Sequence, residues 1–144
     1  MKTITEGESA REEFDTHFNM GVAYREMNLL DDAIKEFEAA ANSLDSAAHA
    51  REMVQCCGML STCYLEKGMA RSTVRWCQTG LALADISSHE SMALRYDMGV
   101  AYSLTGETDK ALECFGKLFD VDPTYRDVAQ RIDGLKSVSQ RHGP

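Results

Sequence analysis

A set of four landmark residues occurs twice in this chain, and the second set is displaced from the first by 78 positions throughout. The landmarks are a glycine, a tyrosine, an alanine and a phenylalanine: Gly21, Tyr24, Ala33 and Phe37, and then Gly99, Tyr102, Ala111 and Phe115. A constant displacement over four positions indicates an internal repeat. Repeats with a period of about 20–50 residues are stacked supersecondary units, so this feature restricts the fold more than composition does.

A third, altered copy lies between these two. Tyr64 follows Tyr24 by 40 residues and precedes Tyr102 by 38, so it stands near half of the displacement. In this copy Thr73 takes the place of the alanine, and Cys77 takes that of the phenylalanine. The spacing is kept although the residues have changed, and the chain is therefore predicted to contain three units.

The spacing within each unit is that of two packed helices. A glycine three residues before a tyrosine lies on the same helical face, and its missing side chain lets a second helix approach closely. The alanine serves the same approach from the second helix, and the two aromatic rings fill the space beside it. Asn28, Gly68 and Gly106 each follow their tyrosine by four residues and are expected to end the first helix of each unit.

This combination of residues resembles the tetratricopeptide repeat, whose pattern contains a small residue, a tyrosine, an alanine, a phenylalanine and a terminal proline. Pro123 closes the third unit in that manner, whereas the first unit has no such proline. The aromatic residue that opens the family's first helix is replaced by His17, Cys57 and Arg95. The usual period is about 34 residues, so each unit here is about five residues longer. The resemblance implies an all-α fold, a right-handed α-solenoid forming a single domain over residues 1–144.

Three repeats and a capping helix are expected to make up this domain. Repeat 1 would cover about residues 14–47, repeat 2 about 48–87, repeat 3 about 88–123 and the capping helix about 124–136. Within them the sequence pattern predicts seven helices, at Ser9–Met27, Leu30–Ser43, Ala48–Lys67, Ala70–Ala84, Ser88–Leu104, Glu107–Phe119 and Thr124–Leu135.

Local signals indicate two of the helix starts. Ser87, with Glu90 three residues later, has the pattern of a capping box, and Pro123 suits the first position of the last helix. That last helix carries apolar residues on one side and charged residues on the other, as a helix that seals the end of a solenoid should. Residues 1–7 and 137–144 carry little apolar surface and are expected to be frayed.

The charge of the chain excludes several classes of partner. The formal net charge is −8, and residues 1–45 hold eleven acidic and four basic residues. Nucleic acid and anionic membranes both require a basic surface, so neither is expected as a partner. The acidic first repeat either keeps the protein soluble or steers a basic partner toward it. Because no apolar run reaches membrane-spanning length and no signal-peptide pattern is present, a cytoplasmic location is expected.

The five cysteines are expected to be free, buried thiols. No Cys-x-x-Cys motif occurs, and the adjacent Cys56 and Cys57 cannot direct two thiolates at one zinc ion from a helix. An odd count also disfavours a complete disulfide framework. The four histidines have no metal-ligand spacing, and no nucleophile is paired with a base. No metal site, no cofactor, no catalytic residue and no enzymatic activity are therefore predicted.

In the resembled family the first helices line a concave groove. The equivalent positions of this chain give the predicted peptide-binding groove: Phe18, Val22, Arg25, Thr62, Leu65, Tyr96, Val100 and Ser103. Some family members hold a C-terminal carboxylate with lysine and asparagine at these positions, and this chain has neither. An apolar trough with a polar rim is expected instead, with Phe18 and Tyr96 exposed in it. The alternative is that neighbouring helices or the chain's own tail cover both rings.

The function that the resemblance implies is protein–protein interaction. The first hypothesis is an adaptor or scaffold that binds a peptide or helical segment in the groove, without catalysis. Segments of the chain look like those of bacterial repeat modules attached to signalling or surface-machinery proteins. The alternative is a secretion-type chaperone that binds apolar segments of its clients. A third use of an apolar groove is self-assembly into a homo-oligomer.

Overall fold

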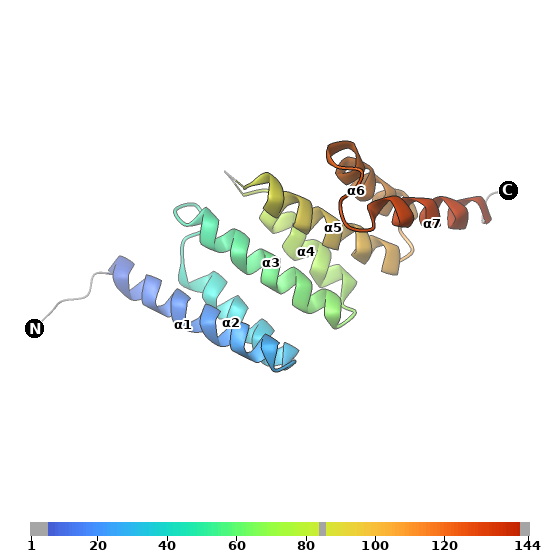
Figure 1. Ribbon diagram of the computed structural model, residues 1–144. Helices are drawn as coiled ribbons and strands as arrows, with labels where there is room; N and C mark the ends of the chain where they lie inside the picture. The colour runs from blue at the N-terminus through green and yellow to red at the C-terminus, as the bar shows by residue number, and fades with distance from the viewer. Residues whose placement is uncertain (1–5, 84–85, 142–144) are drawn as a thin grey trace, which may run out of the picture.

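The computed structural model describes residues 6–83 and 86–141, which form seven α-helices and no strand. The helices are α1 (Glu6–Glu26), α2 (Leu30–Ser43), α3 (Ala50–Glu66), α4 (Ala70–Leu81), α5 (Ser88–Leu104), α6 (Thr108–Val121) and α7 (Val128–Arg141) (Figure 1). The all-α prediction is therefore confirmed.

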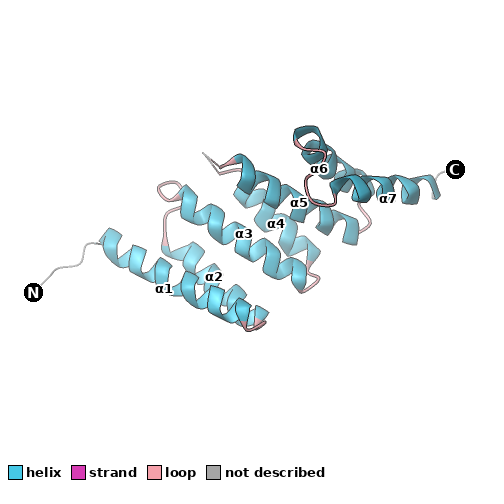
Figure 2. Cartoon of the chain, in the orientation of Figure 1, coloured by secondary structure: helices cyan, strands magenta, loops and turns pink. Residues whose placement is uncertain are grey.

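The helices pack in three successive pairs: α1 on α2, α3 on α4, and α5 on α6. Neighbouring pairs are joined by contacts of α2 with α3, of α4 with α5 and of α3 with α5. The last helix, α7, packs on α6. Figure 2 shows the result as an elongated stack with α1 at one end and α7 at the other. This arrangement, in which each pair contacts mainly its neighbours, is an α-solenoid.

Each pair turns through the residue that the sequence pattern indicated. Asn28, Gly68 and Gly106 have φ angles of 60°, 76° and 77°, the left-handed region that glycine and asparagine adopt most readily. In all three turns the amide five residues after the tyrosine donates to the tyrosine carbonyl oxygen at 2.9 Å: Leu29 to Tyr24, Met69 to Tyr64 and Glu107 to Tyr102. These bonds satisfy carbonyl groups that the end of the helix leaves free.

The repeat glycines make the close helix contact that their spacing predicts. A Cβ atom built on Gly21 would lie 2.6 Å from Cε1 of Phe37, and one on Gly99 would lie 2.8 Å from Cε1 of Phe115. Both phenylalanine rings are fully buried. The ring of the second helix therefore occupies the space that a side chain on the first helix would need.

The middle pair keeps this packing with different residues. Ser61 holds the glycine position, and Thr73 and Cys77 hold the alanine and phenylalanine positions; all three are fully buried. Trp76, which is half-buried, packs against the core clusters on both sides of the middle pair. Its ring supplies the volume that the smaller Cys77 lacks.

All five cysteines are buried and none is in a disulfide. Burial raises the pKa of Cys56 to about 12 and that of Cys57 to about 11, because desolvation disfavours the thiolate. These thiols therefore act as small apolar side chains of the core. Among the described residues no three histidine, cysteine, aspartate or glutamate side chains are grouped so that they could hold a metal ion.

The first and the last helix extend further toward the ends of the chain than the sequence pattern predicts. The helix α1 begins at Glu6, three residues before the predicted start, and α7 extends to Arg141, so parts of both segments expected to be frayed are helical. The capping box at Ser87 is present as predicted, with its hydroxyl accepting the Glu90 amide at 3.1 Å. The predicted end of the fourth helix at Ala84 lies outside the described residues.

The start of the last helix was also predicted wrongly. Pro123 does not open α7, because the carboxylate of Asp122 accepts the amide of Thr124 at 2.9 Å and holds the chain in a turn. Arg126 then takes a left-handed conformation with φ of 42°, which interrupts any helix at that point. The helix begins only at Val128, whose side chain is fully buried.

Ion pairs link successive first helices along the stack. Arg11 of α1 pairs with Glu52 of α3 at 2.5 Å, and Arg51 of α3 pairs with Glu90 of α5 at 3.3 Å. The two arginine side chains are largely exposed, so solvent screens each pair and its contribution to stability is small. The first helices are therefore held side by side mainly by the second helices behind them.

Candidate functional site

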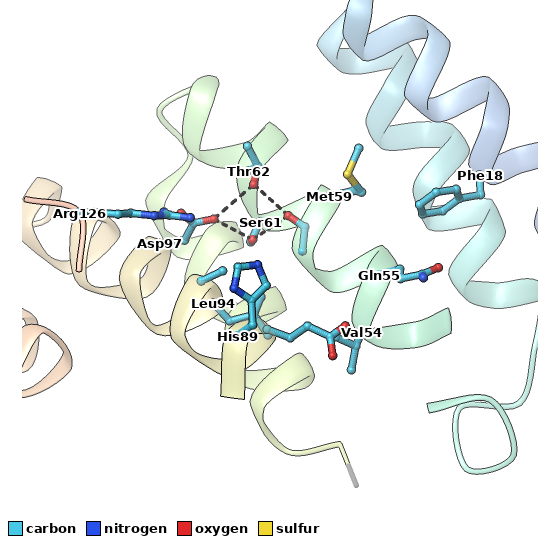
Figure 3. Close-up of a pocket in the computed structure, with 13 residues that line it drawn as sticks. Phe18, Val54, Gln55, Met59, Ser61, Thr62, His89, Leu94, Asp97 and Arg126 are labelled. Carbon is cyan, nitrogen blue, oxygen red and sulfur yellow. Dashed lines mark hydrogen bonds between the residues drawn. The ribbon is translucent and has the colours of Figure 1, made fainter. Parts of the chain in front are cut away.

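A cavity of about 560 Å³ lies where α1, α3 and α5 come together. It receives side chains from all three first helices and from the connection between α6 and α7 (Figure 3). We call it the first-helix cavity; the residues that the following argument uses are Phe18, Gly58, Met59, Leu94, Asp97 and Arg126.

The apolar wall of the cavity is anchored in the core. The ring of Phe18 stacks on Phe14 with 5.5 Å between centroids and meets the buried Phe37 edge-on at 5.4 Å. Leu94, on the opposite side, is almost fully buried and belongs to the core between the middle and last pairs. Because both side chains are fixed by buried neighbours, the wall is pre-formed rather than made on binding.

The polar part of the cavity centres on Asp97 of α5. Its Oδ2 atom lies 3.1 and 3.3 Å from the hydroxyls of Ser61 and Thr62 on α3, which share their protons between this carboxylate and the carbonyl oxygen of Gly58, at 3.0 and 2.9 Å. Burial raises the pKa of this carboxyl above the usual 3.8, and the two hydroxyls and the nearby arginines only partly oppose that effect. Among the described residues, Asp97 forms no ion pair, so its only hydrogen-bond donors there are neutral hydroxyls.

Arg126 stands at the rim of the first-helix cavity. Its guanidinium carbon lies 4.7 Å from the ring centre of Tyr96 and 5.2 Å from that of Tyr125. Stacking on two aromatic faces holds the charged group by cation–π attraction. Figure 3 shows the side chain beside Asp97, yet the two groups are not within ion-pair distance.

The predicted groove residues fall into separate places. Phe18 and Thr62 line the first-helix cavity. Val22 and Arg25 line a smaller adjoining cavity of about 180 Å³, where Arg25 pairs with Glu66 at 2.9 Å. Leu65 is half-buried and lines neither cavity. The structure thus brings the residues of the first two repeats near one another, while their role in binding stays a prediction.

The residues predicted in the third repeat face the C-terminal cap instead. The Tyr96 hydroxyl donates to Asp127 at 2.5 Å and accepts from Arg131 of α7 at 2.9 Å. Val100 packs into the same cluster, and the Ser103 hydroxyl donates to the carbonyl of Gly99. Tyr96 and Phe18 occupy equivalent positions, but Tyr96 packs against the segment that leads into α7 and bonds to Arg131 of that helix.

Sequence reasoning missed the residue with the most distinctive chemistry. Asp97 lies next to Tyr96, which was selected, but on the adjoining face of the helix. The available signal was a single acidic residue between Tyr96 and Met98, within a stretch of otherwise mainly apolar residues. Met59 of the middle repeat, at the position equivalent to Asp97, was missed for the same reason. Which face of α5 meets α3 depends on packing that a single repeat does not reveal.

A second groove lies at the far end of the stack, between α6 and α7. Its volume is about 530 Å³, and Leu112, Gly116, Phe119 and Ile132 form its apolar part. Phe119 is 40 % exposed, which is high for a phenylalanine. This end groove lacks a buried charged group and is the main alternative to the first-helix cavity as a contact surface.

The fold defines a class of protein, an α-solenoid of helix pairs, and here its first helices line a cavity. The sequence profile described as "Tetratricopeptide repeat" matches residues 14–43 and 93–125, which are the two well-preserved copies. The chain belongs to the tetratricopeptide-repeat family. The unmatched middle segment is the copy whose landmark residues have changed, and it nevertheless forms the pair α3 and α4.

A solved structure supports this fold. The C-terminal TPR-containing domain of a Plasmodium falciparum protein described as an FK506-binding protein superposes with a TM-score of 0.79 at 18 % sequence identity. The match covers 95 % of this chain and 94 % of the other. At that identity the likeness shows the fold alone. No curated protein matches the chain.

Membership of the family gives the general kind of activity. Tetratricopeptide repeats generally mediate protein–protein interactions, and their fold is typical of modules without catalysis. In the described residues no helix is long and apolar enough to cross a membrane.

Proposed function

We propose that this protein is a non-catalytic binding module that holds a segment of another protein in the first-helix cavity. The observation that carries the proposal is the cavity itself. Its volume of about 560 Å³ lies within the range of about 300–1,000 Å³ that is usual for ligand sites. Its apolar wall of Phe18, Met59 and Leu94 suits an apolar side chain of the partner.

A peptide or helix fits the site better than a nucleic acid or a small charged metabolite. The chain carries a net charge of −8, which opposes binding of polyanions. The cavity also opens along the row of first helices, where Val22 and Arg25 line its smaller neighbour. A segment lying across α1, α3 and α5 would place successive side chains in these two depressions.

Gly58 provides a sharp test of this function. A Cβ atom added there meets nothing within 4 Å, and the residue lines the first-helix cavity. Gly58→Leu should therefore fill the cavity without disturbing the core. Leucine also has a higher helix propensity than glycine, so the substitution should not destabilise α3. Immobilised protein, incubated with a lysate of its native host, should capture partners in the unchanged form and lose them in Gly58→Leu.

Two matched variants complete the experiment. Gly134→Leu has the same open surroundings but lies outside both grooves, so it should capture the same partners as the unchanged protein. Gly116→Leu fills the end groove and should also leave capture intact. If Gly116→Leu removes capture and Gly58→Leu does not, the end groove is the binding surface and the proposed site is wrong.

A further inference from the structure

The half-buried carboxylate of Asp97 is a charged group in the wall of the first-helix cavity, which is lined by both apolar and polar residues. Ser61 and Thr62 both donate to its Oδ2 atom, and no hydrogen bond among the described residues reaches Oδ1. An ionised carboxylate out of water requires a partner charge or several strong donors. The two hydroxyls are neutral and are shared with the carbonyl oxygen of Gly58, so they meet this requirement only in part, and Asp97 lines the first-helix cavity (Figure 3).

Glu90, Arg126 and His89 also line the cavity, and the first two are already engaged. Glu90 pairs with Arg51 at 3.3 Å and accepts the backbone amide of Ser87. Arg126 lies over the faces of Tyr96 and Tyr125. The charge of Asp97 is therefore the one that a ligand could neutralise, and the acidic chain around it favours a cation.

The middle repeat departs from the repeat pattern at the two residues that hold this carboxylate. The outer repeats have Gly21-Val22 and Gly99-Val100, whereas the middle repeat has Ser61-Thr62. Both replacements introduce a hydroxyl, and both hydroxyls donate to Asp97. The changed copy thus supplies a polar site that the two regular copies lack.

From these contacts we propose that the first-helix cavity binds a lysine or arginine side chain of the partner segment, with its cationic head on Asp97. The methylene groups of such a side chain would lie along Phe18, Met59 and Leu94 while the head reaches the carboxylate. A guanidinium has the advantage, since it loses less hydration than an ammonium and offers several donors to the free oxygen. This inference rests on the proposed function and names the chemistry that the partner must carry.

Small probes can test the cation site without knowing the partner. The n-butylguanidinium ion reproduces an arginine side chain, and n-butylurea has nearly the same shape without the charge. Titrated into isotopically labelled protein, n-butylguanidinium should shift the amide resonances of Ser61, Thr62 and Asp97 and bind at least about tenfold tighter than n-butylurea. That ratio is the contrast expected when a charge-assisted hydrogen bond is lost.

The variant Asp97→Asn keeps the size and the hydroxyl contacts but removes the charge. It should bind both probes equally weakly, while Asp120→Asn, which changes an exposed carboxylate at the end groove, should behave like the unchanged protein. Equal binding of the two probes to the unchanged protein would overturn the proposal. So would undiminished guanidinium binding in Asp97→Asn, because the cation would then lie elsewhere.

Partner capture separates this proposal from the proposed function. If Gly58→Leu removes capture and Asp97→Asn weakens it at least about tenfold, the proposed function and the cation site are both supported. If Gly58→Leu removes capture while Asp97→Asn binds the partner as tightly as the unchanged protein, the cavity is the binding site and the cation inference is wrong. If Gly58→Leu has no effect, the proposed function fails, whatever the probes show.

Discussion

Replacing Gly99 by alanine tests the helix contact on which the whole stack depends. The added Cβ would lie 2.8 Å from two ring atoms of Phe115 and 3.2 Å from Cβ of Cys114. The Phe115 ring cannot easily withdraw, because it is fully buried and meets the edge of Tyr96 at 5.8 Å. Forcing a methyl group into such a contact costs about 1–3 kcal/mol.

Alanine also has an advantage that must be subtracted. It is favoured over glycine in a helix by about 0.5–1 kcal/mol, so the net loss for Gly99→Ala should be about 0–2.5 kcal/mol. Gly58→Ala gains the same helix propensity with no contact within 4 Å. It should therefore stabilise the protein by about 0.5–1 kcal/mol.

The difference between the two variants isolates the packing cost. Urea denaturation followed by far-ultraviolet circular dichroism should place Gly99→Ala about 1–3 kcal/mol below Gly58→Ala in free energy of unfolding. Gly21→Ala should behave like Gly99→Ala, since its Cβ would lie 2.6 Å from Phe37. Equal stability of Gly58→Ala and Gly99→Ala would refute the assignment of the repeat glycines to close contacts.

The remaining predictions concern one carboxylate, one hydroxyl and the thiols. Because burial raises the pKa of Asp97 in the folded protein, the folded state binds the proton more tightly than the unfolded state, and stability falls as the pH rises from the usual pKa through the raised one. Asp97→Asn should therefore have a higher free energy of unfolding than the unchanged protein at pH 7 in urea denaturation. This difference should disappear near pH 4, around the ordinary pKa of aspartate. A variant that is less stable at pH 7 would contradict the expected effect of the carboxylate. Tyr96→Phe removes a hydroxyl that joins α5 to Asp127 and Arg131 and should cost about 1–2 kcal/mol in the same assay without affecting guanidinium binding. A thiol reagent should react with none of the cysteines in the folded protein and with all five after unfolding, and rapid labelling of Cys56 or Cys57 under native conditions would show that the core opens easily.

The parts of the fold that could be predicted are those with a local physical cause. A left-handed turn requires a residue such as Gly68 or Asn28, and the capping box at Ser87 needs only two residues three positions apart. Both signals are complete within a few residues of sequence. The packing of Gly21 and Gly99 could be read as well, because the repeat shows the same pair of contacting residues twice.

The start of α7 could not be predicted from local sequence signals. Pro123 is equally suited to the first turn of a helix and to a tight turn, and the sequence pattern favoured the helix. The outcome depends on Arg126, whose left-handed backbone is held by stacking of its side chain on Tyr96 and Tyr125. That conformation is uncommon for arginine and follows from tertiary contacts that a local pattern does not contain.

The site was predictable only to the level of which helices line it. The family pattern pointed to the first helices, and Phe18 and Thr62 do line the cavity. It treated Tyr96 as equivalent to Phe18, although the end of the stack gives Tyr96 a different neighbour in α7. It also gave no reason to select Asp97, since the burial of that carboxylate arises only where α3 and α5 meet.

The middle repeat shows how an irregular copy can carry specificity in a regular stack. Its glycine position is filled by Ser61, and the loss of close approach is offset by the smaller Cys77 opposite it and by Trp76 beside it. The same replacement supplies a hydroxyl to Asp97, so the change that weakens the repeat pattern also prepares a binding group. A half-buried carboxylate whose only hydrogen-bond donors are neutral lowers the stability of the free protein, and a bound cation would offset that cost. Folding stability and recognition of a basic side chain are therefore coupled through one residue of α5.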